Sequence, residues 1–134
     1  MHQSPAAHQH QALLDASRRI GFSMNIDALT GSLLRTLAAS KPGGRFLELG
    51  TGTGLSTAWL LEGMDAASTL ISIENDLACV QIAQEVLGTD PRLTLLTEDA
   101  DTWLSRNEVQ FDFIFADTWA GKYRLLDAAL GAVK

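Results

Sequence analysis

The sequence predicts an α/β protein in which helices cover both faces of a parallel sheet. Short apolar runs alternate along the chain with segments of helical periodicity, as they do in repeated strand–helix units. These runs are mostly apolar, which is typical of strands buried on both faces. The predicted strands are 46–49, 69–73, 93–96 and 111–116.

Six further segments have helical spacing. In the second of them the predicted apolar stripe consists of Leu29, Leu33, Leu34 and Leu37, with Asp27 placed to cap the helix. The opening MHQSPAAHQHQ lacks the basic end and apolar stretch of a secretory signal and is predicted to be a mobile tail. The last helix has no strand after it, so we expect the front part of a larger domain. The predicted helices are 11–19, 27–40, 57–63, 77–87, 100–104 and 125–133.

Composition narrows the choice of partners. The chain of 134 residues has a net charge of −6, and Arg18–Arg19 is its only adjacent basic pair, which argues against a nucleic acid partner and favours a small-molecule substrate.

No apolar run is long enough to span a bilayer. The single Cys79 excludes an internal disulfide and fits a cytoplasmic protein. Cys79 is predicted to be a small core residue, and the histidines His2, His8 and His10 predict no specific metal site.

The stretch FLELGTGTGLS places three glycines on alternate positions after the first strand. A dinucleotide fingerprint needs a glycine three places after Gly52, where this sequence has Leu55. Alternate glycines with Glu48 two places ahead suit a ligand without phosphates. The carboxylate of Glu48 would accept a hydrogen bond from an ammonium group of this ligand. That is the outline of S-adenosylmethionine. The alternative is that Gly50, Gly52 and Gly54 form only a tight turn.

Polar groups also follow the other three strands. Glu74 lies at the end of the second, where an acid can accept from both hydroxyls of a ribose. Asp99 and Ala100 follow the third and are expected at the adenine edge, although Asp101 could instead cap the next helix. Asp117 ends the fourth. Ligands of open parallel sheets bind at this edge, so the four together predict a binding site.

These motifs resemble those of class I S-adenosylmethionine-dependent methyltransferases, and more narrowly the small-molecule O-methyltransferases typified by catechol and caffeoyl-CoA O-methyltransferase. The likeness covers about residue 24 to the end: MNIDALTGSLL, FLELGTGTGLSTAWLL, LISIEND, LTLLTEDADTWL and DTWAGKY each match a segment of that group. The resemblance implies a Rossmann-like doubly wound sheet of order 3-2-1-4 that lacks the family's last strands. It also implies a tail and helix at 1–20 and a cofactor-binding domain at 21–134.

The resemblance also implies roles for single residues. Met24 would close over the cofactor, and Trp119 would stack on its adenine. Asp117 would be a catalytic residue and the first ligand of Mg²⁺ or another divalent cation that activates a substrate hydroxyl. The full predicted cofactor-binding set is Met24, Glu48, Gly50, Thr51, Gly52, Gly54, Ser56, Glu74, Asn75, Asp99, Ala100, Asp117 and Trp119.

Two departures from the family pattern stand out. Ala120 occupies the position of the catalytic lysine, and Lys122, two places later, is the candidate general base, with a solvated lysine as the alternative. The family's two further metal ligands would follow a fifth strand, which this chain does not contain.

The expected function is O-methylation of a small molecule with S-adenosylmethionine as the cofactor. Two other classes stay open: a nicotinamide-dependent oxidoreductase, and a non-catalytic assembly module or incomplete fragment. An unpaired sheet edge also leaves a homodimer open.

Overall fold

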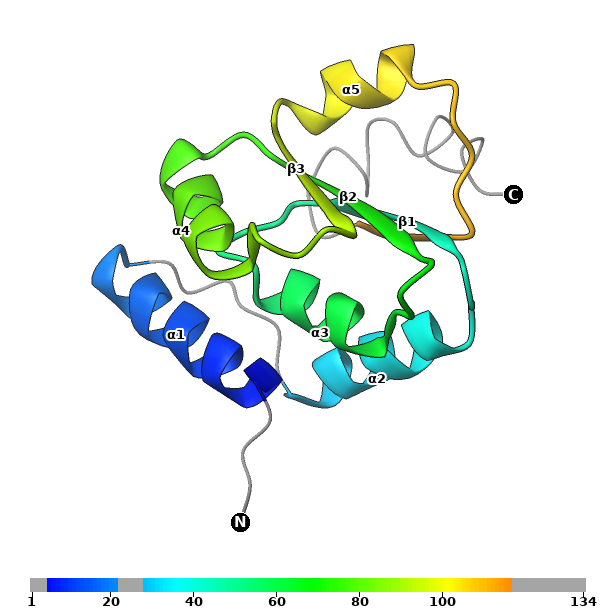
Figure 1. The fold of residues 1–134 in the computed structure, drawn as a ribbon. Helices are drawn as coiled ribbons and strands as arrows, with labels where there is room; N and C mark the ends of the chain where they lie inside the picture. Colours follow the sequence, from blue (N-terminus) through cyan, green and yellow to red (C-terminus); the bar gives the residue numbers. More distant parts are fainter. Residues whose placement is uncertain (1–4, 22–27, 117–134) are drawn as a thin grey trace.

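A four-stranded parallel sheet forms the centre of the molecule, with helices on both faces (Figure 1). The computed structural model describes residues 5–21 and 28–116, with side chains from residue 9 onward. The strand order is β3-β2-β1-β4, which confirms the predicted fold class. The strands are β1 (Arg45–Leu49), β2 (Thr69–Glu74), β3 (Leu93–Thr97) and β4 (Phe113–Ala116).

The parallel register brings the carboxyl ends of the strands to one edge. Leu49 at the end of β1 pairs with Ile73 in β2 and Ala116 in β4, and Glu74 pairs with Thr97 in β3. We call this edge the rim. Among the described residues it comprises Gly50, Glu74, Asn75, Glu98 and Asp99.

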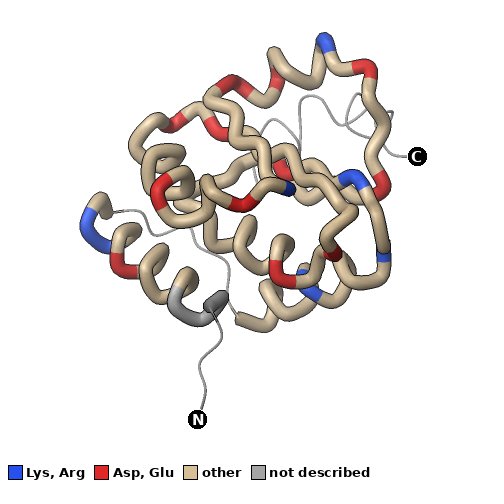
Figure 2. Tube along the Cα trace, in the orientation of Figure 1, with Lys and Arg blue, Asp and Glu red and all other residues tan. Residues whose placement is uncertain are grey.

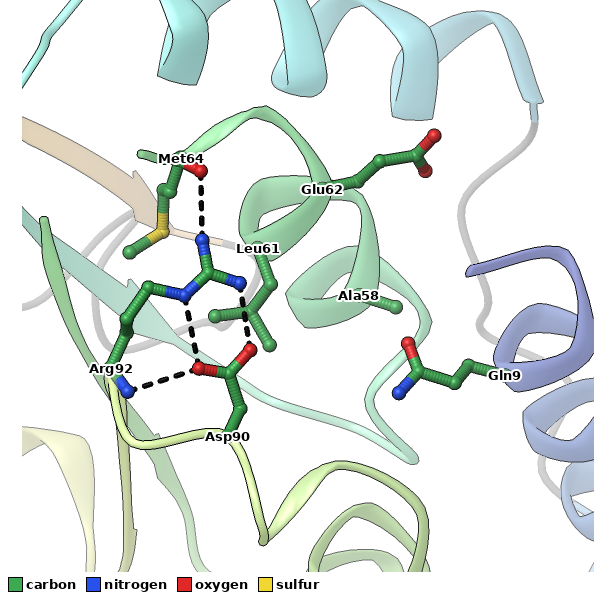
Figure 3. Close-up of a pocket in the computed structure, with 7 residues that line it drawn as sticks. All are labelled: Gln9, Ala58, Leu61, Glu62, Met64, Asp90 and Arg92. Atoms are coloured by element: carbon green, nitrogen blue, oxygen red, sulfur yellow. Dashed lines mark hydrogen bonds and ion pairs between the residues drawn. The ribbon is translucent and has the colours of Figure 1, made fainter. Parts of the chain in front are cut away.

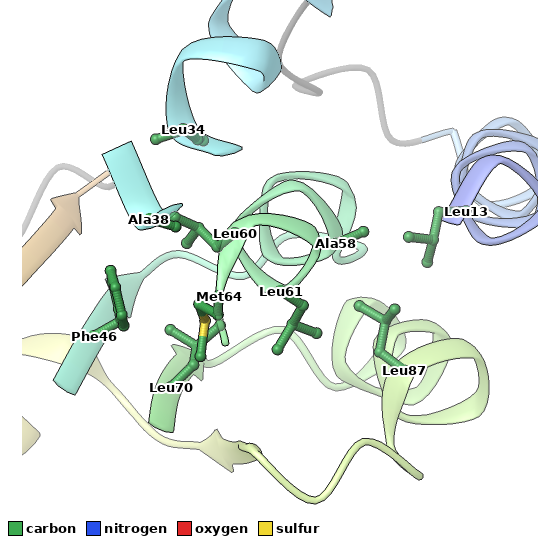
Figure 4. Packing of buried hydrophobic residues seen from close by; sticks show 10 residues of the cluster. All are labelled: Leu13, Leu34, Ala38, Phe46, Ala58, Leu60, Leu61, Met64, Leu70 and Leu87. Atoms are coloured by element: carbon green, nitrogen blue, oxygen red, sulfur yellow. The ribbon is translucent and has the colours of Figure 1, made fainter. Parts of the chain in front are cut away.

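The two sheet faces have separate cores. On one face α1, α2, α3 and α4 contribute apolar side chains that meet Phe46 and Leu70 of the sheet (Figure 4). On the other face Trp103 and Leu104 of α5 pack on Leu47 and neighbouring strand residues. The helices are α1 (Pro5–Arg19), α2 (Ala28–Ala39), α3 (Leu55–Gly63), α4 (Leu77–Leu87) and α5 (Ala100–Arg106).

The first helix is longer and more deeply packed than predicted. It begins at Pro5, so the predicted mobile tail is wrong from that residue onward. Leu13 is fully buried against the core, and the His10 ring lies 4.5 Å from the Trp59 ring of α3. These tertiary contacts stabilise residues whose sequence alone has weak apolar periodicity. The helix α1 thus packs on the core formed by the later elements, and the division of the chain at residue 20 stays a prediction.

The predicted apolar stripe of α2 is only partly correct. Leu29 is 84% exposed and Leu33 is 57% exposed, whereas Leu34 is buried. The inner face carries Gly31, where an added Cβ would lie 2.2 Å from the Trp59 Nε1 atom. Close approach of α2 to α3 at this glycine turns the two leucines outward.

Among the described residues no helix has the length and apolar character needed to cross a membrane. Acidic side chains are frequent in the segments that lead from β2 into α4 and from β3 into α5 (Figure 2). They are Glu74, Asp76, Glu98, Asp99 and Asp101.

Candidate cofactor site

The glycine loop joins β1 to α3 in a backbone conformation that favours glycine. Gly50, Gly52 and Gly54 have φ angles of +97°, +57° and +108°, a region that side-chain-bearing residues rarely adopt. The Gly50 and Thr51 amides both donate to the Ile73 carbonyl, at 2.8 and 3.2 Å, which holds the loop against the end of β2. The alternate glycines thus produce a tight, hydrogen-bonded turn at the rim.

Gly54 lies where the loop approaches α4. A Cβ at this position would be 3.1 Å from both the Ala83 Cβ and the Leu87 Cδ1 atoms. Close packing is the role that the third glycine plays in a dinucleotide fingerprint; here Gly54 performs it one position earlier. The helix α3 begins at the next residue, Leu55, two residues before the predicted start. A direct cofactor contact from Gly54 stays a prediction.

Glu48 is fully buried beneath the loop and does not face solvent. Its carboxylate accepts hydrogen bonds from Ser56 and Thr57, at the start of α3, and from Ser72 in β2. Thr51 in turn lies 2.5 Å from the Ser72 hydroxyl, oxygen to oxygen. The described contacts of Glu48 therefore fix the loop between β2 and α3. The predicted contacts of Glu48, Thr51 and Ser56 with a cofactor remain untested.

Ser72 and Thr57 were missed at the sequence level. Ser72 shares the strand face of Leu70, which points into the core, so a polar residue at this position signals a buried partner. Thr57 carries a weaker signal, because a buried hydroxyl on a helix also bonds readily to its own backbone.

Glu74 lies at the rim beside the glycine loop. Its Oε1 atom accepts from the Gly52 amide at 2.9 Å, and its Oε2 atom accepts from the Asn75 and Asp76 amides at 3.1 and 3.0 Å. The side chain is half-buried. The acid predicted to bind a ribose and the loop predicted to hold the cofactor are therefore in direct contact.

The loop after β3 ends in a helix cap. Asp99 is the residue that caps α5, accepting from the Thr102 amide at 3.0 Å, whereas Asp101 lies in the first turn. The proposed cap at Asp101 is therefore wrong. Ala100 is buried at the start of the same helix. Glu98 forms an ion pair with Arg106, the last residue of α5.

Several predicted residues lie outside the described part of the chain. They are Met24, Asp27, Asp117, Trp119, Lys122 and the predicted helix 125–133. Within residues 5–21 and 28–116 no group of three His, Cys, Asp or Glu side chains is arranged to hold a metal ion.

Cys79 is buried in α4, as predicted for a core residue. Burial, together with the nearby carboxylates of Asp76 and Glu74, raises the pKa of its thiol to about 11. A thiol in this state is a poor nucleophile at neutral pH.

A cavity of about 300 Å³ lies away from the rim, at the amino ends of β2 and β3 (Figure 3). Arg92 crosses it, donating to both Asp90 carboxylate oxygens and to the Met64 carbonyl. The guanidinium thus ties the end of α3 to the loop before β3. This arrangement is a structural clamp, and the alternating glycines and acids lie at the opposite edge.

A profile of the family described as "Methyltransferase domain" matches residues 47–130, which is more than half of the chain. The chain belongs to this methyltransferase domain family. The match includes the glycine loop and the ends of all four strands.

Solved structures similar to this methyltransferase domain share its fold. A Klebsiella pneumoniae protein assigned provisionally to the O-methyltransferases is 28% identical with a TM-score of 0.82, covering all of this chain and 63% of that one. The O-methyltransferase TomG from Streptomyces achromogenes, in complex with S-adenosylmethionine, has a TM-score of 0.81 at 22% identity, covering 100% and 62%. The Podospora anserina methyltransferase PaMTH1, bound to S-adenosylhomocysteine, has a TM-score of 0.84 at 22% identity, covering 99% and 59%.

Curated sequences similar to the methyltransferase domain are named as tRNA methyltransferases. The tRNA1(Val) (adenine(37)-N6)-methyltransferase of Citrobacter koseri is 34% identical over 76 residues, or 54% of this chain. The protein of the same name from Salmonella typhi is 33% identical over the same length. The match spans 31% of the length of each of these relatives.

Proposed function

We propose that this domain binds S-adenosylmethionine at the rim and transfers its methyl group to an oxygen atom of a small molecule. The observation that carries the proposal is the contact between Glu74 and the Gly52 amide. Through this contact a half-buried acid at the end of a strand is bonded to a loop whose three glycines have positive φ angles. Ligands of open parallel sheets bind at such a position.

The chemistry of the rim fits this cofactor. An ionised carboxylate only accepts hydrogen bonds, and the two hydroxyls of a ribose are donors that match both oxygens of Glu74. Asp99 lies on the neighbouring strand end, where its negative charge would repel a pyrophosphate and tolerate a cation, whereas the charge of Glu98 is paired with Arg106. The carboxylates of Glu74 and Asp99 therefore favour S-adenosylmethionine over a nicotinamide dinucleotide. When bound, the sulfonium group supplies an electrophilic methyl carbon.

The contribution of the described residues is alignment. The network around Glu48 fixes the loop backbone, and Glu74 would orient the ribose, so that the methyl carbon meets the acceptor in one geometry. Asp117 as a ligand of a divalent cation and Lys122 as a general base extend the proposal from the family resemblance. A cytoplasmic location and a homodimer are likewise predictions.

Methylation of an adenine in tRNA is the second candidate, because the curated relatives carry that name. Charge argues against it, since the chain has 16 acidic and 10 basic residues and a net charge of −6. Binding to RNA depends on neutralising phosphates with Lys and Arg. Transfer of a labelled methyl group to bulk tRNA and to a panel of catechols and phenols would distinguish the two acceptors.

Replacement of Glu74 tests the cofactor site. We expect Glu74→Ala to weaken S-adenosylhomocysteine binding at least about tenfold, because two hydrogen bonds to a charged group are lost. The matched control is Glu85→Ala, which removes an exposed carboxylate from α4 and should leave the affinity unchanged. Calorimetry at equal protein concentration provides the comparison, with melting temperatures to verify folding. Equal affinities of wild type and Glu74→Ala for S-adenosylhomocysteine would show that Glu74 is not part of the cofactor site.

A further inference from the structure

The first helix reaches the glycine loop directly. α1 packs against α3 and α4, and its residues Leu13, Ala16 and Ser17 are all buried. The Ser17 Oγ atom lies 2.6 Å from the Thr53 Oγ1 atom, across 36 positions of sequence. Thr53 is itself fully buried. A residue of α1 thus contacts the loop that joins β1 to α3.

The direction of this hydrogen bond follows from the number of protons. The Ser17 hydroxyl donates to the Leu13 carbonyl at 2.7 Å within α1. A serine hydroxyl has one proton, so Thr53 is the donor to Ser17. The chain Thr53 to Ser17 to Leu13 therefore connects the loop to the backbone of α1.

Thr53 lies in the part of the loop whose backbone conformation depends on glycine. It lies between Gly52 and Gly54, which both have positive φ angles. Glycines gain the most conformational freedom when a loop is released, so holding their ordered conformation requires fixed contacts on either side. Glu74 holds the loop from the sheet through the Gly52 amide, and Ser17 holds it from the helix side through Thr53.

We propose that Ser17 is a positioning residue of the cofactor site, which keeps the glycine loop in its binding conformation through the hydroxyl of Thr53. This inference rests on the proposed function, because the measured property is cofactor affinity. A net hydrogen bond of about 1 kcal/mol corresponds to roughly a fivefold change in affinity when it must be restored on binding. The expected effect is therefore a three- to tenfold loss.

The test is a double-mutant cycle on the full chain, read by calorimetry with S-adenosylhomocysteine. Ser17→Ala and the isosteric Thr53→Val should each weaken binding three- to tenfold, and the double variant should be no weaker than either single one. Thr53→Ser, which keeps the hydroxyl, should retain wild-type affinity. Thr36→Ala is the matched control, because Thr36 makes the same hydroxyl-to-carbonyl bond, to Ser32, inside α2. It should leave affinity unchanged.

Hydrogen exchange provides a readout that is independent of ligand. In the free protein, amides of 52–54 should exchange faster in Ser17→Ala than in wild type, while those of α5 should not change. If wild type binds and Ser17→Ala binds equally well, or if the two single effects multiply in the double variant, the positioning role is wrong and the cofactor site stands. If wild type binds neither S-adenosylhomocysteine nor S-adenosylmethionine, the proposed function fails and this role fails with it.

Discussion

Replacing Gly54 by alanine tests how the loop is built. The residue has a φ of +108°, and an added Cβ would lie 3.1 Å from side-chain atoms of Ala83 and Leu87. A left-handed backbone costs a residue with a Cβ about 1–2 kcal/mol. Overpacking a well-filled site costs about 1–3 kcal/mol. The free energy of unfolding should therefore fall by about 2–5 kcal/mol, a large part of the stability of a typical domain.

Gly43→Ala separates the two contributions. Gly43 also has a positive φ, +63°, but the nearest atom to an added Cβ is 4.0 Å away. The free energy of unfolding of Gly43→Ala should fall by only about 1–2 kcal/mol, because of backbone strain alone. Urea unfolding followed by far-ultraviolet circular dichroism measures both variants. If Gly54→Ala were no less stable than Gly43→Ala, the close packing of the loop on α4 would be refuted.

Three further predictions concern other buried or partly buried groups. Glu48→Gln should lower the free energy of unfolding by about 2–3 kcal/mol, because an amide NH₂ would face hydroxyls that now donate to the carboxylate; a loss below about 0.5 kcal/mol in urea unfolding would contradict the network. Hydrogen bonds from Arg92 hold the pKa of Asp90 below its usual value, so this pair adds stability above about pH 4 that is lost as pH falls through the folded-state pKa. Asp90→Asn should accordingly flatten the acid limb of a stability–pH curve, and an unchanged slope below about pH 4 would speak against the clamp. The thiol of Cys79, with its pKa of about 11, should react with iodoacetamide at pH 8 at least about a hundredfold more slowly in the folded protein than in urea; equal rates would show that the site is open.

The sheet was predictable because its signal is local. The mostly apolar runs at β1 to β4 and the acids and glycines that follow them can be read without knowing any tertiary contact. Parallel pairing then brings Gly50, Glu74 and Asp99 to one edge.

The features that were mispredicted depend on contacts between elements. The start of α1 at Pro5 is held by packing such as that of His10 on Trp59, which no local pattern reveals. The orientation of Leu29 and Leu33 depends on how closely Gly31 lets α2 approach α3. In both cases tertiary packing decided between alternatives that the sequence allowed.

The candidate site shows the same division. Its backbone was predictable from the alternating glycines, whereas the partners of its side chains were not. The contacts of Glu48 with hydroxyls of α3 and β2 could not be read from the sequence, and its predicted contact with a ligand stays a prediction. The contact of Ser17 with Thr53 joins residues 36 positions apart, which sequence spacing does not indicate.

A crystal structure of the chain grown with S-adenosylhomocysteine tests the central claim most directly. The account predicts the nucleoside at the rim, with both ribose hydroxyls bound to the Glu74 carboxylate and the glycine loop against the amino-acid portion. A ligand bound elsewhere, for instance in the cavity crossed by Arg92, or a rim that stays empty at saturating ligand, would contradict it.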